Sequence, residues 1–207
     1  MFSKFFNLSQ EKQDRILNAA LKEFVLKGYQ LASTNEIVKE ADISKGLLFH
    51  YFKNKKTLYL FLYEHFMEIF IQDIVSKLDR TEKDIFVRYR DIGKLKFELY
   101  SKYPDMFNFI KSVYKEDASE VKGDIDKLNK QFLSIGYHDL FGDIDYSKFK
   151  DDLDIEKTIN VIFWTLEGFA YQYLDKVTAL NIEEIDFEGL MKEMEIYCEM
   201  LRDAFYK

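Results

Sequence analysis

The sequence contains little of what a β-sheet protein needs for its turns. Among 207 residues there is one proline, Pro104, and there are only eight glycines. Tight turns depend on these two residue types because glycine accepts positive φ and proline fixes φ near the value of a turn. Their scarcity argues against a fold of many short strands and favours long helices.

Cysteine and long apolar runs are also scarce. Cys198 is the only cysteine, which excludes an internal disulfide and a cysteine-based metal site. No run of 18 apolar residues occurs, so we expect no transmembrane helix and no membrane partner. The first residues, MFSKFFNLSQEK, are too short and too polar for a signal peptide, and we therefore expect a cytoplasmic protein.

Signatures of an enzyme or of a cofactor protein are missing as well. No glycine-rich phosphate loop and no nucleophile motif is present. The three histidines, His50, His65 and His138, show no metal-ligand spacing. Residues 143–147 resemble the start of a calcium loop, but Lys148 stands where that loop requires glycine. We expect no catalytic activity, no metal and no cofactor.

The charge of the chain is unevenly distributed. Apolar residues make up 47% and charged residues 32%, which is the composition of a globular protein, and the net charge is −7. Residues 1–56 contain ten Lys/Arg and six Asp/Glu, a net charge of +4, which leaves −11 on the other 151 residues. A basic end on an acidic body is expected when that end meets the phosphates of nucleic acid.

Two long helices are predicted in the first part of the chain. Apolar residues recur at helical spacing over residues 9–27, where Ser9 is placed to cap the helix and Gly28 to end it. Asn54 is placed to cap a second helix, which runs from residue 55 to about residue 78.

Two short helices are predicted between them. Ser33 and Glu36 form a capping-box pattern at the start of a helix over 34–41. After a three-residue break, Ser44 is placed to cap a helix over 45–51. Two short helices on either side of such a break form the layout of a helix-turn-helix.

The rest of the chain is also predicted to be helical. The last two helices carry more apolar surface than one neighbouring helix needs. After Gly136, residues 137–152 are predicted to be a loop. The predicted helices are about 82–102, 104–113, 116–135, 154–177 and 183–206.

The stretch from Ser33 to Lys56, STNEIVKEADISKGLLFHYFKNKK, carries an ordered motif. It resembles the signature of the TetR family of transcriptional regulators, in which a Thr-rich helix start leads through a turn to a Ser-x-Gly-x-Leu-Tyr-x-x-Phe-x-x-Lys segment. The resemblance covers about residues 9–62, and the remainder matches in helix count and length. The matching residues are Ser33, Thr34, Ile37, Ala41, Ile43, Ser44, Gly46, Leu48, Phe52, Lys55 and Leu58.

The resemblance implies an all-α protein of about nine helices. Residues 1–56 are expected to be a three-helix DNA-binding domain, and residues 57–207 an effector-binding and dimerisation domain. The implied partners are a double-stranded DNA operator, a second copy of the chain bound through the last two helices, and a small-molecule effector. In this family such proteins are usually repressors that a ligand releases from DNA.

The helix predicted over residues 45–51 has residue types that suit the DNA major groove. Leu48 and Phe52, four residues apart, are expected to face the core. Leu47 can meet a thymine methyl, Lys45 can reach a guanine or a phosphate, and Gly46 lets the backbone approach closely. With the positions that the resemblance implies, the predicted DNA contacts are Ser33, Thr34, Asn35, Ser44, Lys45, Gly46, Leu47, Phe49, His50, Tyr51 and Lys55.

Three positions depart from the family pattern. Asp42 stands in the turn where glycine is usual, and aspartate tolerates a left-handed backbone better than most residues. Phe49 replaces a usual tyrosine, so a hydroxyl contact to phosphate is lost. Lys56 replaces an acidic residue in the first turn of a helix, where a nearby phosphate would offset the unfavourable dipole.

The body of the chain is rich in aromatic residues. The resemblance implies a pocket for small, often apolar molecules, and Glu167 could attract a cation there. The alternative is that the aromatics are ordinary core and that Glu167 lies on the surface. The predicted pocket residues are Phe97, Tyr100, Tyr103, Phe107, Phe132, Phe163, Trp164, Glu167 and Tyr171.

Two other functions remain open from the sequence. A helical carrier of small apolar molecules would bind ligand tightly without salt-dependent affinity for DNA. An adaptor that meets a protein partner through its acidic body would have a poorly formed cavity.

Overall fold

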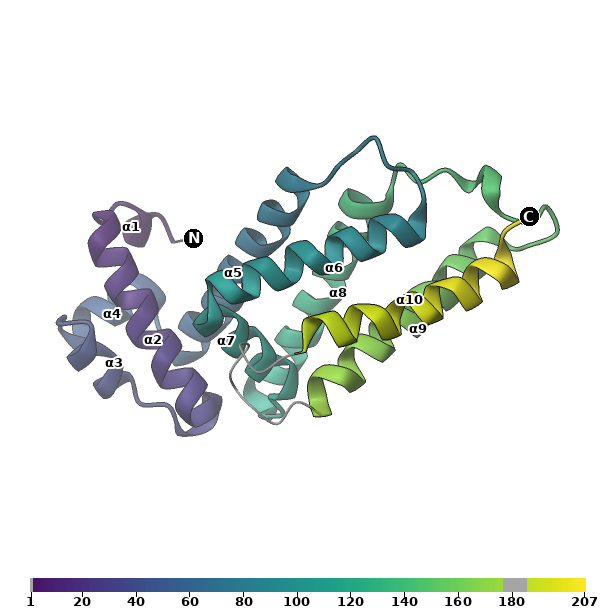
Figure 1. Ribbon diagram of the computed structural model, residues 1–207. Coiled ribbons are helices and arrows are strands. Elements are labelled where there is room, and N and C mark those ends of the chain that lie inside the picture. Colours follow the sequence, from purple (N-terminus) through teal and green to yellow (C-terminus); the bar gives the residue numbers. More distant parts are fainter. Residues whose placement is uncertain (1, 177–185) are drawn as a thin grey trace. The chain divides into compact units, whose positions relative to one another are not determined.

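The computed structural model describes residues 2–176 and 186–207, and regular structure in these ranges is helical (Figure 1). The one exception there is an isolated antiparallel bridge between Phe149 and Tyr206. This confirms the predicted all-α class. The helices are α1 Ser3–Phe6, α2 Gln10–Leu31, α3 Thr34–Glu40, α4 Lys45–Phe52, α5 Lys55–Lys77, α6 Ile85–Lys102, α7 Pro104–Lys115, α8 Ser119–Phe141, the 3-10 turn η1 Tyr146–Lys148, α9 Ile155–Lys176 and α10 Phe187–Phe205.

Several predicted helix ends differ from the structure. Helix α8 continues through Gly136 to Phe141, so the prediction of a loop from residue 137 is wrong over its first turn. Helix α6 begins at Ile85 rather than at residue 82, because the Asp84 carboxylate accepts the backbone N–H of Phe86 at 3.0 Å and so caps the helix there. The predicted helix ends at residues 177 and 183–185 lie outside the described residues.

The predicted caps have mixed outcomes. Ser44 Oγ accepts the N–H of Leu47 at 3.2 Å and Asn54 Oδ1 accepts the N–H of Thr57 at 2.8 Å, which confirms both. Ser33 makes no side-chain cap bond, so the predicted capping box is wrong. Gly28 breaks the regular geometry of α2 with a φ of 66°, and one further helical turn follows it.

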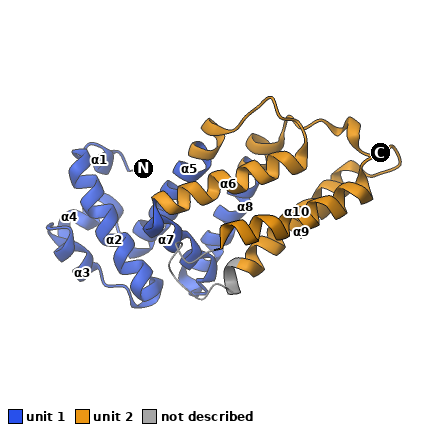
Figure 2. Cartoon of the chain, viewed as in Figure 1, with its two compact units in different colours: residues 1–72, 103–135 blue, residues 73–102, 136–207 orange. Residues whose placement is uncertain are grey.

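The chain divides into two compact units, shown in Figure 2. Unit 1 comprises Met1–Gln72 and Tyr103–Ile135. Within it, α2 packs along α7, and Phe24 of α2 meets Tyr59 of α5 and Phe109 of α7 with ring-centroid distances of 4.9 and 6.4 Å. These rings are fully buried, so the DNA-binding candidate helices share one core with α5 and α7.

Unit 2 comprises Asp73–Lys102 and Gly136–Lys207. Helix α10 packs against α6 and α9. At the start of α6, the buried Arg88 guanidinium donates to the carbonyl of Leu140 at 2.9 Å and to the carboxylate of Asp143 at 2.8 Å. Lys83 binds the second oxygen of Asp143 at 2.7 Å. These bonds tie α6 to the end of α8 and hold the pKa of Asp143 below its usual value, Arg88 contributing most.

None of the helices in the described ranges combines the length and the apolar character needed to cross a bilayer.

Candidate nucleic-acid interface

Helices α3 and α4 are joined by a turn with a left-handed residue. Asp42 is exposed and has a φ of 52°, which confirms the conformation considered for this departure from glycine. The N–H of Ile43 donates to the carbonyl of Val38 at 3.0 Å, and buried Ala41 closes the end of α3. These bonds fix the turn without a glycine.

Helix α4 has one buried face and one open face. Leu48 and Phe52 are buried, as their spacing predicts. Lys45, Gly46, Leu47 and His50 are exposed, and Leu47 keeps 38% of its surface accessible although it is a large apolar side chain. Phe49 and Tyr51 are half-buried. The open face therefore combines apolar, basic and backbone groups, as a base-reading surface does.

Gly46 leaves open space on this face, near the start of α4. A Cβ placed on it would meet no atom within 4 Å, so the protein's own packing does not require glycine here. Beside it, the ammonium of Lys45 lies 5.9 Å from the ring centroid of Phe49, one turn further along α4. The space is of the kind that lets another molecule approach the backbone.

The start of α3 is held by a residue that the sequence analysis missed. Glu23, largely buried on α2, accepts the backbone N–H of Ser33 at 2.8 Å and also the ammonium of Lys27 at 2.9 Å. It thereby fixes the residue before α3, whose first turn carries Thr34 and Asn35. The signal in the sequence was a carboxylate three residues after Ala20, within the apolar stripe of α2.

Two of the lysines near α4 are engaged inside the protein. The ammonium of Lys55 donates to the carbonyls of Gln30 at 3.0 Å and Ala32 at 3.2 Å, and it lies 4.8 Å from the ring centroid of Tyr29. Lys55 therefore ties the end of α2 to the start of α5, and its contact with DNA stays a prediction. Lys56 forms an ion pair with Asp124 of α8 at 2.7 Å. This carboxylate balances the charge of Lys56, so no phosphate is needed to explain a lysine at this position.

A third contact in unit 1 joins α2 to the turn between α7 and α8. The backbone N–H of buried Tyr29, next to the kink at Gly28, donates to the Glu116 carboxylate at 2.9 Å. The second oxygen of Glu116 accepts the N–H of Ala118 at 3.0 Å. One carboxylate thus links the end of α2 to the start of α8.

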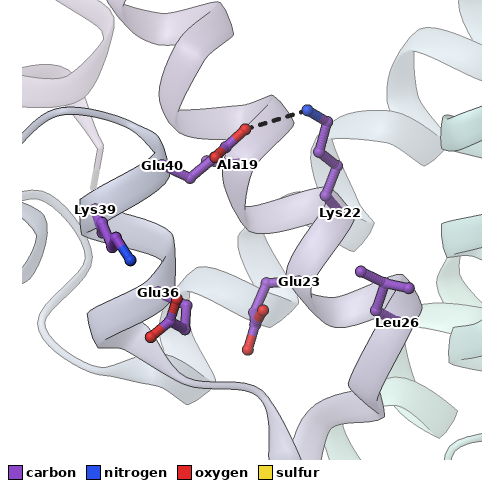
Figure 3. Close-up of a pocket in the computed structure, with 7 residues that line it drawn as sticks. All are labelled: Ala19, Lys22, Glu23, Leu26, Glu36, Lys39 and Glu40. Atoms are coloured by element: carbon purple, nitrogen blue, oxygen red, sulfur yellow. Dashed lines mark hydrogen bonds and ion pairs between the residues drawn. The ribbon is translucent and has the colours of Figure 1, made fainter.

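Two surface hollows occur in unit 1, and charged side chains contribute to the lining of both. Figure 3 shows the first, about 270 Å³ and lined by charged side chains of α2 and α3, with Lys22 bonded to Glu40. The second, about 240 Å³, lies over Tyr29, Lys55 and residues 118–120. Neither is lined by the aromatic residues predicted to form an effector pocket.

The predicted pocket residues are divided between the two units. Tyr103, Phe107 and Phe132 belong to unit 1, where Phe107 and Phe132 are buried, and Phe97, Tyr100, Phe163, Trp164, Glu167 and Tyr171 belong to unit 2.

In unit 2 these residues have different surroundings. Phe97 stacks on Phe187 with centroids 4.0 Å apart. Trp164, Glu167 and Tyr171 are exposed on α9. Glu167 accepts the hydroxyl of Tyr89 at 2.9 Å, and nearby Lys96 lowers the pKa of its carboxyl group. That any of them lines a pocket stays a prediction. No group of three or more potential metal ligands occurs among the described residues.

Comparison with known proteins agrees with this geometry. The family profile described as bacterial regulatory proteins, tetR family, matches residues 16–61. The chain is 28% identical over 132 residues to the HTH-type transcriptional regulator QacR of Staphylococcus aureus, covering 62% of this chain and 68% of that protein. It is 26% identical over 160 residues to the fatty acid metabolism regulator protein of Bacillus subtilis, covering 75% and 80%.

The whole fold is also found among solved structures. The transcriptional regulator FadR from Bacillus subtilis, in complex with stearoyl-CoA, matches with a TM-score of 0.62 at 19% identity, over 91% of this chain and 96% of that one. At this identity the match supports the fold alone.

The protein is a helix-turn-helix transcriptional regulator that binds DNA. Its helices α3 and α4 form the helix-turn-helix, and the exposed face of α4 is basic and apolar. Within that class, residues 16–61 match the tetR family of bacterial regulatory proteins, and the chain is similar to the named regulators.

Proposed function

We propose that this regulator is a cytoplasmic repressor that binds a two-fold operator through α4 and leaves it when a small molecule binds the body. DNA binding is assigned to residues 1–56, and effector binding and dimerisation to residues 57–207. The observation that carries the proposal is the open face of α4, where Lys45, Leu47 and His50 surround the free space over Gly46. The partners are an operator duplex, an effector and a second copy of the chain.

The dimer is proposed to form through α9 and α10. In the described chain, these adjoining helices leave large apolar side chains exposed: Val161 by 40%, Trp164 by 72%, Ile196 by 52% and Met200 by 64%. Such a patch is unusual on a monomer and typical of an interface between subunits. A two-fold pair would join these helices as a four-helix bundle and present two α4 helices to two half-sites.

The effector is proposed to act through linkage. An effector that binds more tightly to the arrangement unable to bind the operator lowers the affinity for the operator. It does so by the same factor by which the operator lowers the affinity for the effector. One relative's structure holds stearoyl-CoA, and the many aromatic residues of this chain fit an apolar effector as a class. Within unit 1, the Glu116 link between α2 and α8 offers one path by which movement of the body reaches α3 and α4.

The proposal is tested by fluorescence anisotropy on DNA from the region upstream of its own gene, with scrambled DNA as competitor, at several salt concentrations. We expect specific binding that falls steeply with salt and is lost in a Lys45→Ala/Leu47→Ala double variant. Lys12→Ala is the control, because it removes an exposed cation from α2 outside the predicted contact set. Tight binding of an apolar ligand without specific DNA binding would support the carrier function instead.

A further inference from the structure

Helix α1 lies outside the segment that matches the family, which begins at residue 16. It is a single turn, Ser3–Phe6, and the amide of Gln13 holds its end by donating to the carbonyls of Phe6 at 3.2 Å and Leu8 at 2.9 Å. Since Gln13 belongs to α2, α1 is fixed in place although it is too short to be stable alone.

Phe5 of α1 contacts both α4, the helix predicted to contact DNA bases, and α5. Its ring is fully buried, with its centroid 5.0 Å from that of Phe52 in α4, 5.5 Å from Phe61 in α5 and 6.2 Å from Tyr51 in α4. Phe2 adds contacts of 5.9 Å to Phe52 and 4.4 Å to Phe61. The last turn of α4 is therefore packed against α1 as well as against α5.

We propose that Phe5 is a positioning residue for DNA recognition: it holds the last turn of α4, including Tyr51, so that the open face meets DNA in one orientation. This rests on the proposed function. An eight-residue helix has little stability of its own, and α4 has only two buried side chains, Leu48 and Phe52, by which the protein holds it. Base reading requires placement within about 0.5 Å, whereas non-specific attraction to phosphates does not.

The proposal is separable from a general role of Phe5 in stability. If Phe5 only adds buried area, its loss lowers the melting temperature and leaves the ratio of specific to non-specific affinity unchanged in the folded protein. If it positions α4, that ratio falls. Phe6, the neighbouring residue on the same helix, is 50% exposed and serves as the matched control.

The experiment compares the wild type, Phe5→Ala, Phe5→Leu and Phe6→Ala, each as the full chain and at a temperature where it is folded. Operator and scrambled DNA affinities are measured by anisotropy. We expect Phe5→Ala to weaken operator binding about tenfold or more while scrambled binding changes less than about threefold. Phe5→Leu should recover part of the loss because it restores apolar volume, and Phe6→Ala should match the wild type.

Hydrogen exchange of the DNA-free protein, read by mass spectrometry, gives an independent measure. Phe5→Ala should speed exchange over residues 45–52 and leave residues 34–40 unchanged. Equal changes in both DNA affinities, or unchanged exchange over 45–52, would overturn the proposal. If the wild type shows no specific operator, the proposed function fails, while the exchange comparison still reports whether Phe5 holds α4.

Discussion

At the scale of single residues, substitution of Gly46 tests whether this glycine serves DNA binding, because the fold does not require it. A Cβ there has free space, and glycine inside a helix costs about 0.5–1 kcal/mol relative to alanine. We expect Gly46→Ala to raise the free energy of unfolding by up to about 1 kcal/mol and to weaken operator binding. Denaturant unfolding and anisotropy measure the two effects.

A matched control exists for this substitution. Gly123 lies within α8, and a Cβ there also meets nothing within 4 Å. Gly123→Ala should stabilise the protein by a similar amount and leave DNA affinity unchanged. If Gly46→Ala also leaves operator affinity unchanged, the backbone of α4 does not approach the DNA closely.

Glu116 is the residue whose loss should be felt at the end of α2. In Glu116→Ala, the part-buried N–H of Tyr29 loses its acceptor, and leaving such a donor unsatisfied costs up to about 1–3 kcal/mol. The free energy of unfolding should fall by that amount, measured by urea denaturation. Asp117→Ala, which removes an exposed charge one residue away, should have little effect. Equal losses in the two variants would mean that charge, rather than this bond, matters.

Local chemistry was predictable where neighbours in sequence make the bonds. Ser44, Asn54 and Asp42 behave as predicted because a cap or a left-handed turn depends on residues within three positions. Ser9 and Ser33 do not, since neither makes the predicted side-chain cap bond, and Glu23 on α2 binds the backbone N–H of Ser33. The bonds of the Lys55 ammonium to carbonyls more than twenty residues away were not predictable from local sequence, and its contact with DNA stays a prediction.

At the scale of elements, tertiary burial decided the helix ends that the sequence analysis misjudged. Gly136 predicted an end for α8, but Leu140 and Phe141 beyond it are buried. Burial of two such side chains outweighs the cost of one helical glycine, which is about 1 kcal/mol. Helix α1 was missed because four residues show no periodicity, and its only buried side chain is Phe5.

The bonds between α6 and the end of α8 predict a pH dependence. Because the pKa of Asp143 is lowered by Arg88 and Lys83, its charged form stabilises the fold above its unfolded pKa, which is about 4, and this contribution is lost as the pH falls towards the folded pKa. Asp143→Asn should therefore melt lower than the wild type at pH 7, and the difference should shrink below about pH 4. A difference that stays constant from pH 7 to pH 3 would contradict this account.

At the scale of the whole molecule, the exposed face of α9 and α10 predicts the oligomeric state. Trp164→Glu would place a charge within the proposed interface, and we expect it to shift the protein from dimer to monomer in sedimentation velocity. Leu133→Glu is the control, because Leu133 is 70% exposed on α8 and lies outside that face. If the Trp164→Glu protein remains dimeric, the dimer interface lies elsewhere.

The class of the molecule was predictable from its helix pattern and motif, whereas the residues of an effector pocket stay a prediction. Aromatic residues of the predicted pocket set have different surroundings: Phe132 is buried with its ring 5.9 Å from that of Tyr63, while Trp164 is 72% exposed. Residue type and helical spacing do not separate a core ring from a surface ring, because that depends on which helices pack together.

The composition of unit 1 bears on how such regulators can be recombined. A chimera joined at residue 56 would carry α2 away from α7, leaving Phe24 without Phe109 and Tyr29 without Glu116. It would also part Lys56 from Asp124. A DNA-binding domain transferred together with α7 and the first part of α8 would keep these contacts. The part of this protein that can be transferred is therefore discontinuous in sequence.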